Sequence, residues 1–193
     1  MKIIFFGGCF DPPHRGHYEI IRKCSKQCDQ LLLIPTLYSP LKNKTTSTAP
    51  HDILQMLELL IQNIDHPIKI DKYDFSRSGP SYTVNTICYI KKRYPDSSIS
   101  MVIGADQLMQ FQKWKEYNKI INSVHIIGFN RANNDFTPPT GMNILWFGNF
   151  NLDISSVGIR KDIAAGELKE NVLTTLVKNY IFENNLYGVN RGH

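Results

Sequence analysis

Two histidines, His14 and His17, stand three residues apart in FGGCFDPPHRGH, a stretch rich in glycine and proline near the start of the 193-residue chain. In a helix, about 100° per residue places His17 in one stripe with Ile21, and His14 lies close to that stripe. Each imidazole can donate a hydrogen bond to an anionic oxygen, whether the ring is neutral or protonated. The spacing predicts a binding site for a phosphate group.

The elements on either side of this stretch are those that a phosphate site needs. An apolar run at residues 2–6 predicts a strand covered on both faces, and residues 15–28 predict a helix. Gly7 and Gly8 lack side chains, so a phosphate can approach the backbone closely. The start of the helix adds unpaired N–H groups and the positive end of its dipole. We therefore expect the anion in the loop between strand and helix.

Two other interpretations of the histidine pair stay open at this point. Both rings could be buried or capping side chains that meet no ligand. They could also bind a metal ion, but the further histidines His51, His66 and His125 are dispersed, and Cys9 is the only thiol nearby. The GxGxxG fingerprint and the Walker sequence GxxxxGK[ST] are both absent. We expect no metal site and a phosphate loop of another kind.

Strand-like and helix-like segments alternate along the rest of the chain. The other predicted strands are residues 30–35, 68–75, 98–104, 124–129 and 144–148. The other predicted helices are residues 51–64, 81–93, 155–166 and 167–185. This alternation predicts an α/β fold, a Rossmann-like doubly wound and mainly parallel sheet with helices on both faces. We expect one domain over residues 1–193, because no linker divides the chain.

Bulk composition excludes several classes of protein. The chain is 42% hydrophobic and 20% charged, as ordinary globular proteins are. Its net charge of +5 suits an anionic ligand, but the basic residues are scattered, so we expect no nucleic-acid partner. The apolar N-terminus is too short to span a membrane and lacks a cleavage site, which predicts a cytoplasmic protein without a membrane partner. The oligomeric state stays open, a homo-oligomer included.

Several segments resemble one enzyme family. GGCFDPPHRGH at 7–17 resembles the GGxFxPxHxGH motif of the nucleotidyltransferase superfamily, which binds ATP phosphates with two histidines and a helix N-terminus. ISSVGIR at 154–160 resembles that superfamily's ISSTxIR motif. PTLYSPLK at 35–42, GPSYTVNT at 79–86 and GADQLMQFQKW at 104–114 are similar to segments of the bacterial nicotinate-nucleotide adenylyltransferases. The resemblance implies that ATP and nicotinate mononucleotide are the substrates, in a reaction of NAD biosynthesis that releases pyrophosphate.

The resemblance also implies roles for residues of these motifs. The expected catalytic residues are His14, His17 and Arg160, which would stabilise charge on the phosphates. The expected ATP-binding residues are Gly7, Gly8, Phe10, Gly104, Asp106 and Ser156. The residues expected to bind nicotinate mononucleotide are Lys42, Thr83 and Trp114, with the indole stacking on the pyridine ring. Mg²⁺ is expected to arrive with ATP, held by its phosphates and by water.

Four of these residues also fit roles without a ligand. Arg160 could be a surface arginine, Lys42 a solvated lysine, Asp106 a helix cap and Trp114 a packing residue. Departures from the family pattern bear on the substrate: Cys9 stands where Thr or Ser is usual, and no histidine precedes the lysine of the 35–42 segment. The alternative functions are a related transferase, acting on phosphopantetheine or nicotinamide mononucleotide, and a nucleotide-binding module without turnover.

The implied reaction requires no general base. The second pKa of a phosphate monoester is about 6, so the attacking phosphate is already largely ionised at neutral pH. Positioning and electrostatic stabilisation should therefore supply the acceleration. The start of the predicted helix at 81–93 would favour the carboxylate of nicotinate over a neutral amide.

Overall fold

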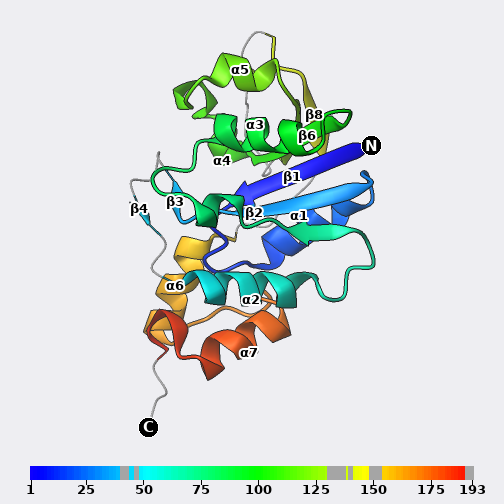
Figure 1. Ribbon diagram of the computed structural model, residues 1–193. Helices are drawn as coiled ribbons and strands as arrows, with labels where there is room; N and C mark the ends of the chain where they lie inside the picture. Colours follow the sequence, from blue (N-terminus) through cyan, green and yellow to red (C-terminus); the bar gives the residue numbers. More distant parts are fainter. Residues whose placement is uncertain (40–43, 46–47, 130–137, 139–140, 148–153, 190–193) are drawn as a thin grey trace.

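The computed structural model describes residues 1–39, 44–45, 48–129, 138, 141–147 and 154–189 (Figure 1). Its main sheet has the order β5-β2-β1-β6-β7-β8, and every neighbouring pair is parallel. These strands are β1 Lys2–Gly8, β2 Gln30–Pro35, β5 Ile68–Ile70, β6 Ser98–Gly104, β7 His125–Phe129 and β8 Ile144–Phe147. Two short strands, β3 Tyr38–Ser39 and β4 Lys44–Thr45, form a separate antiparallel pair. The predicted parallel sheet is confirmed.

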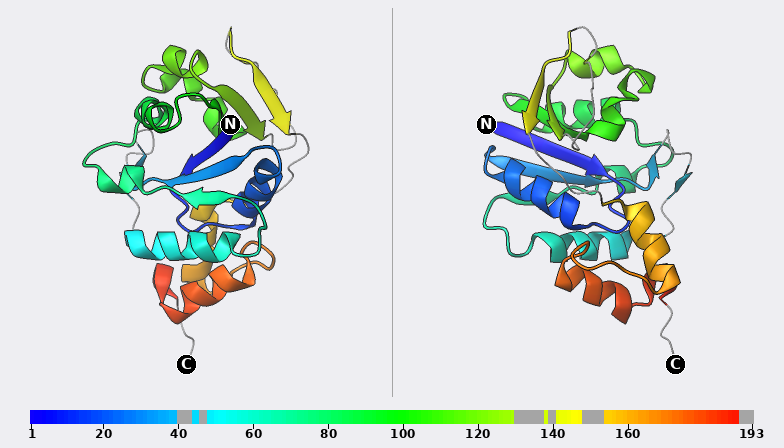
Figure 2. Two further views of the ribbon diagram at one scale, coloured as in Figure 1. Left: turned by 45° about the vertical axis from the view of Figure 1, so that its right-hand side comes forward. Right: turned by 180° about the vertical axis from the view of Figure 1, so that it is seen from behind.

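Helices cover both faces of this sheet, as the two views of Figure 2 show. One face carries α1 Arg15–Ser25, α2 Pro50–Ile61, α6 Ser156–Ala165 and α7 Thr175–Glu183. The other face carries α3 Thr83–Arg93, α4 Ala105–Leu108 and α5 Tyr117–Ile121. The 3₁₀ helices are η2 Tyr73–Ser76, η3 Phe111–Lys113 and η4 Leu186–Gly188.

Each face of the sheet has its own apolar core, because successive side chains of a strand point to opposite sides. In β1, Ile4 and Phe6 pack against α1, α2, α6 and α7, whereas Ile3 and Phe5 pack against α3 and the helices that follow it. All four side chains are at least nine-tenths buried. This explains why β1 reads as a continuous apolar run rather than as an alternating pattern.

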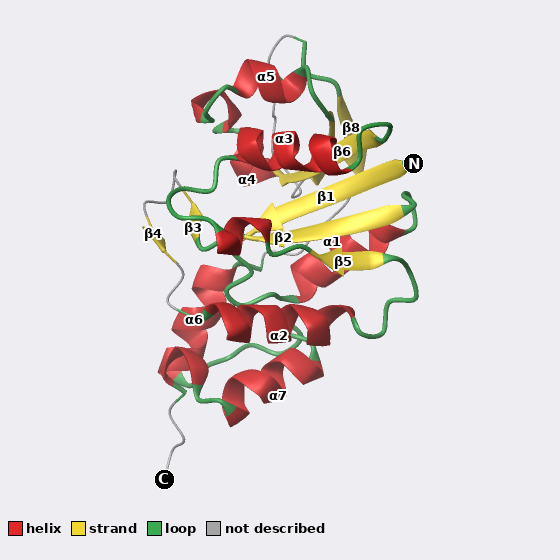
Figure 3. Ribbon diagram, in the orientation of Figure 1, coloured by secondary structure: helices red, strands yellow, loops and turns green. Residues whose placement is uncertain are grey.

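Several predicted elements are longer than those in the structure (Figure 3). The strand predicted over 68–75 ends at Ile70, because the Asp71 carboxylate accepts a hydrogen bond from the Tyr73 N–H at 3.0 Å and turns the chain into η2. The helices predicted over 15–28 and 51–64 end at Ser25 and Ile61, and the helix predicted over 167–185 begins only at Thr175. Within the described residues, no helix is both long and apolar enough to cross a bilayer.

Candidate active site

The candidate site lies at the ends of β1 and β6, where the strand order of the sheet reverses. β2 and β5 follow on one side of β1, and β7 and β8 follow on the other side of β6. The pairing of β1 with β6 stops at Phe6 and Val102, whereas the two strands continue to Gly8 and Gly104. The last residues of β1 and β6 are therefore not paired with each other. They lie at the edge where open α/β sheets bind their ligands.

The predicted glycines occupy this edge and leave room beside the backbone. Among the described residues other than the chain neighbours, a Cβ added to Gly104 would meet no atom within 4 Å, and one added to Gly7 would meet only the Ile34 carbonyl oxygen, at 3.8 Å. At Gly8 the added atom would approach the Phe10 ring at 3.3 Å. The backbone is therefore accessible at Gly7 and Gly104, while Gly8 also accommodates a neighbouring ring.

The two histidines stack at the start of α1. His14 is the N-cap residue, with extended backbone angles, and its N–H donates to Nδ1 of His17 at 3.2 Å. The ring centroids lie 3.8 Å apart with an interplanar angle of 29°. Because Nδ1 of His17 accepts a hydrogen bond, its Nε2 carries the proton in the neutral ring. The pair thus forms one rigid unit in which the tautomer of His17 is fixed.

Phe10 supports this unit from within the protein. Its ring is 1% exposed and meets His17 edge-on, with centroids 5.0 Å apart, and Phe6 at 5.3 Å. Its φ of 49° lies in the left-handed region, which is uncommon for an aromatic residue. The side chain of Phe10 therefore positions His17, and only its backbone is available to a nucleotide.

Gly16 is a residue of the site that sequence reasoning did not single out. It is buried in the first turn of α1, and a Cβ there would lie 2.9 Å from both Cε1 and Nδ1 of His14. Such a distance is well inside van der Waals contact. The histidine stack therefore requires glycine at this position, and the HxGH spacing was the available signal.

Two residues of α6 contact the loop between β1 and α1, residues 9–14, which we call the histidine loop. The Ser156 hydroxyl donates to the Pro12 carbonyl oxygen at 2.9 Å. Arg160 donates from Nη1 to the Asp11 carbonyl oxygen, and Nη1 lies 3.9 Å from the Asp11 carboxylate. The N-cap of α6 is Ser155, whose side chain accepts from the Gly158 N–H at 3.1 Å. The hydroxyl of Ser156, expected at a phosphate, thus binds the loop that carries the histidines.

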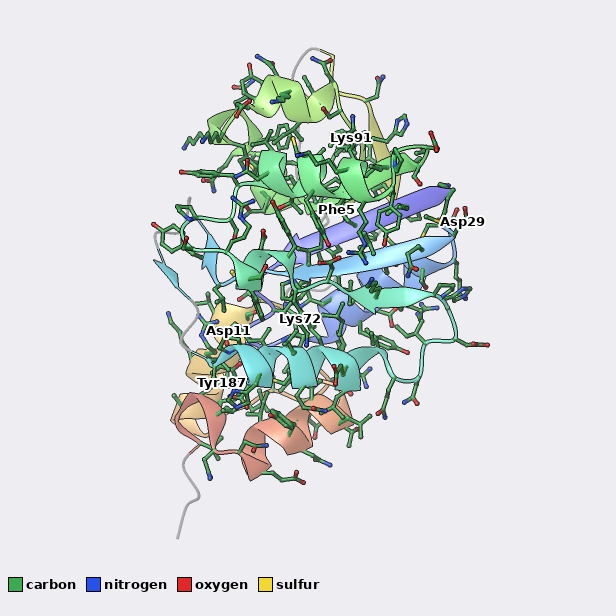
Figure 4. All side chains as sticks on the ribbon, in the orientation of Figure 1. Phe5, Asp11, Asp29, Lys72, Lys91 and Tyr187 are labelled. Atoms are coloured by element: carbon green, nitrogen blue, oxygen red, sulfur yellow. The ribbon has the colours of Figure 1, made fainter. Side chains whose placement is uncertain are left out.

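Tyr187, in η4, joins the same loop. Its hydroxyl donates to Oδ1 of Asp11 at 2.7 Å, across 176 residues of sequence. Figure 4 shows both residues beside α6 and the C-terminal segment. Asp11 is 4% exposed, so its carboxylate depends on these protein donors. Sequence reasoning missed both roles, because the contact joins opposite ends of the chain.

The residues expected at the pyridine lie on the other face of the sheet. Thr83 is the first residue of α3, and Trp114 follows η3. Lys115 brings the two segments together, since its ammonium group lies 4.5 Å from the centroid of the Tyr82 ring. Trp114 packs on Phe111, and its buried Nε1 has no hydrogen-bond partner among the described residues. Within the described part of the chain, the indole thus has an unpaired donor, one residue before the lysine that contacts Tyr82.

Two further expected residues are only partly located. Asp106 lies in α4, directly after Gly104 ends β6, so its backbone stands at the same edge of the sheet as the histidines. Lys42 lies outside the described residues.

The buried carboxyl group of Asp74 interacts with residues at the start of α3. Asp74, in η2, is 7% exposed. Burial raises its pKa to about 6, and Arg77 together with hydrogen bonds from Ser81 and Thr86 opposes that rise. Asp74 therefore ties η2 to the segment that leads into α3, a contact that the sequence pattern did not reveal.

Comparison with known proteins agrees with this geometry. A cytidylyltransferase-like family model matches residues 5–162. The probable nicotinate-nucleotide adenylyltransferase of Leptospira interrogans is 34% identical over 190 residues, which is 94% of each chain. The nicotinate-nucleotide adenylyltransferase of Bacillus subtilis is 31% identical over 188 residues, 96% of this chain and 98% of that one.

A solved structure shares the fold. The Plasmodium falciparum nicotinic acid mononucleotide adenylyltransferase complexed with NaAD aligns with a TM-score of 0.81 and 21% identity over 99% of both chains. The stacked histidines, the open strand edge and the full-length similarity to the two bacterial relatives lead to one conclusion. The chain belongs to the family of the nicotinate-nucleotide adenylyltransferases.

Proposed function

We propose that this enzyme transfers the adenylyl group of ATP to the 5′-phosphate of nicotinate mononucleotide, giving nicotinate adenine dinucleotide and pyrophosphate in NAD biosynthesis. Family membership supports the reaction. The observation that carries the proposal is the stacked pair of His14 and His17 at the edge where β1 and β6 part. This pair supplies hydrogen-bond donors where a phosphate would meet the sheet.

The chemistry is an in-line displacement at the α-phosphorus of ATP. An oxygen of the mononucleotide phosphate forms the new bond to this phosphorus, and the bond to the bridging oxygen of the β-phosphate breaks. No proton has to be removed from the nucleophile, because the phosphate is largely ionised. The protein must hold anions together and stabilise the charge that moves onto pyrophosphate.

Roles on the ATP side follow from this requirement. His14 and His17 donate hydrogen bonds to phosphate oxygens, and Arg160 adds a permanent charge that can bind two oxygens at once. The rest of the nucleotide is expected to contact residues near the sheet edge and in α4 and α6. These residues are Gly7, Gly8, Phe10, Gly104, Asp106 and Ser156. Two observations support these roles: β1, β6 and the start of α4 meet at one sheet edge, and Ser156 binds the loop that follows β1.

Roles on the mononucleotide side fall to Lys42, Thr83 and Trp114. The start of α3 presents unpaired N–H groups near Thr83, and the ammonium group of Lys115 lies against Tyr82. Both features favour an anionic carboxylate over a neutral amide. The nicotinate form is therefore the expected substrate.

Mg²⁺ enters this proposal as part of the ATP substrate. Among the described residues, no three side chains of His, Cys, Asp or Glu gather as a metal-binding set. Asp11, the acidic residue of the loop that carries the histidines, accepts a hydrogen bond from the Tyr187 hydroxyl, and Arg160 lies 3.9 Å from its carboxylate. Phosphate oxygens and water suit Mg²⁺ as ligands, since it sheds water reluctantly.

The test is pyrophosphate release from ATP with nicotinate or nicotinamide mononucleotide. We expect turnover with the acid to exceed turnover with the amide. His17→Ala should lower kcat by about 10²-fold or more, the usual cost of losing one donor to a transition-state oxyanion. The matched control is His66→Ala, since His66 is exposed in the loop before β5. Wild-type turnover in His17→Ala, or turnover with phosphopantetheine instead, would contradict the proposal.

A further inference from the structure

We propose that Tyr187 is a positioning residue of this site: its hydroxyl holds the Asp11 carboxylate, so that Arg160 stays available to the triphosphate. This inference rests on the proposed function, because it assigns Arg160 to ATP. Tyr187 lies 27 residues beyond Arg160. It is outside the two motifs, at 7–17 and 154–160, that resemble those of the nucleotidyltransferase superfamily.

The first step is the environment of Asp11. Its carboxylate is buried, and a buried carboxylate is costly unless hydrogen-bond donors meet it. Oδ1 accepts from the Tyr187 hydroxyl at 2.7 Å, whereas Oδ2 lies 3.9 Å from Nη1 of Arg160. The neutral hydroxyl is therefore the closer partner, and the guanidinium is the more distant one.

The second step is the state of Arg160. Its side chain is 29% exposed. Among the described residues, its hydrogen bond is the one from Nη1 to the Asp11 carbonyl oxygen. A guanidinium carries five N–H donors, so most of them remain for a ligand. The arrangement anchors the arginine by a backbone oxygen without neutralising it in a close ion pair.

The third step is the hydroxyl itself. Burial raises the pKa of Tyr187 above its ordinary value, and the nearby Asp11 charge acts in the same direction while a hydrogen bond with Thr48 opposes it. The hydroxyl thus keeps its proton at physiological pH and always donates. The backbone of Tyr187 has φ 62°, a left-handed conformation that is unfavourable for an aromatic residue. The hydrogen bond of the side chain with Asp11 stabilises this strained turn.

The consequence concerns ATP. Without the hydroxyl, Asp11 would lose its closest donor and would draw Arg160 into a tighter ion pair. Arg160 would then have to leave that pair before binding a phosphate. The effect should appear in the affinity for ATP, and the binding of nicotinate mononucleotide, on the other face of the sheet, should change little.

The experiment compares Tyr187→Phe with Tyr180→Phe. The Tyr180 hydroxyl donates to Oδ1 of Asp52 at 2.8 Å, and Asp52 is also buried, so the control loses the same kind of hydrogen bond in the same C-terminal region. We expect Tyr187→Phe to raise KM for ATP about tenfold, the scale of one hydrogen bond to a charged group, with KM for the mononucleotide within about twofold. Tyr180→Phe should leave both constants unchanged.

A double-mutant cycle separates positioning from general destabilisation. In an Asp11→Asn background the competing charge is absent, so Tyr187→Phe should have no further effect on KM for ATP. Equal kinetics in Tyr187→Phe and Tyr180→Phe, or an undiminished effect in the Asp11→Asn background, would overturn the inference.

Calorimetric binding of a non-hydrolysable ATP analogue gives the same comparison without turnover, so failure of the proposed reaction stays distinguishable. Should Tyr187→Phe fail to fold, Asp11→Asn alone decides: weaker binding of the analogue than in wild type overturns the inference.

Discussion

Replacing Gly16 with alanine tests whether the histidine pair depends on the lack of a side chain at this position. The new Cβ would lie 2.9 Å from Cε1 and Nδ1 of His14. The His14 ring cannot move freely, because it is 7% exposed and stacks on His17 with centroids 3.8 Å apart. Accommodating the methyl group must therefore turn the His14 ring and break the stack.

Stability and catalysis should respond differently to this change. Alanine in a helix is favoured over glycine by about 1 kcal/mol. Turning a side chain by about 30° from its rotamer costs about 0.5–1.5 kcal/mol, so the two effects nearly cancel. The displaced imidazole is not compensated, and loss of one oxyanion donor costs about 10²–10³ in kcat. We expect Gly16→Ala to unfold within a few degrees of wild type while kcat falls by about 10²-fold.

The assay is steady-state pyrophosphate release at saturating concentrations of both substrates, with thermal unfolding measured by circular dichroism. The decisive comparison uses His14→Ala, in which no ring opposes the new methyl group. Gly16→Ala should then have no further effect on kcat. The steric reasoning is refuted if Gly16→Ala keeps the wild-type kcat, or if it costs as much in the His14→Ala background as in wild type.

The remaining predictions concern titratable groups. Burial raises the pKa of Asp74 from 3.8 to about 6, so its contribution to folding stability is complete below pH 3.8 and is lost as the pH rises through about 6. Asp74→Asn should therefore raise the urea midpoint at pH 7.5, and this gain should shrink towards pH 4; an equal gain at both pH values would contradict the assignment. Burial raises the pKa of the Cys24 thiol to about 12, whereas Cys88 is exposed. Iodoacetamide at pH 8 should alkylate Cys88 in the native protein and Cys24 only after unfolding, which peptide mass spectrometry measures; rapid native labelling of Cys24 would rule this out.

The sheet could be predicted from the sequence because its central strands are covered on both faces. The continuous apolar runs at 2–6, 30–35 and 98–104 correspond to β1, β2 and β6, which neighbour one another in the sheet. The edge strand β5 was predicted too long, because an alternating pattern continued past Ile70. A single carboxylate, Asp71, ends that strand, and a periodic pattern carries no information about such a local hydrogen bond.

The site could be predicted only where its residues are neighbours in the chain. The spacing of His14 and His17 indicated a shared face, and the structure places their rings in a stack. The partners of this loop lie 144 to 176 residues away, as in the contacts of Ser156 with Pro12 and of Tyr187 with Asp11. No local pattern specifies which distant donor reaches which oxygen.

These long-range contacts bear directly on the chemistry. A displacement between two phosphates draws its acceleration from positioning and fixed charge, so a small displacement of the donors is costly. The histidine loop is held from one side by α1 and from the other by α6 and η4. Arg160 is attached to this loop by a backbone oxygen rather than by a close carboxylate contact. The fold thereby fixes the position of the guanidinium without a close ion pair, as the proposed binding of the triphosphate by Arg160 requires.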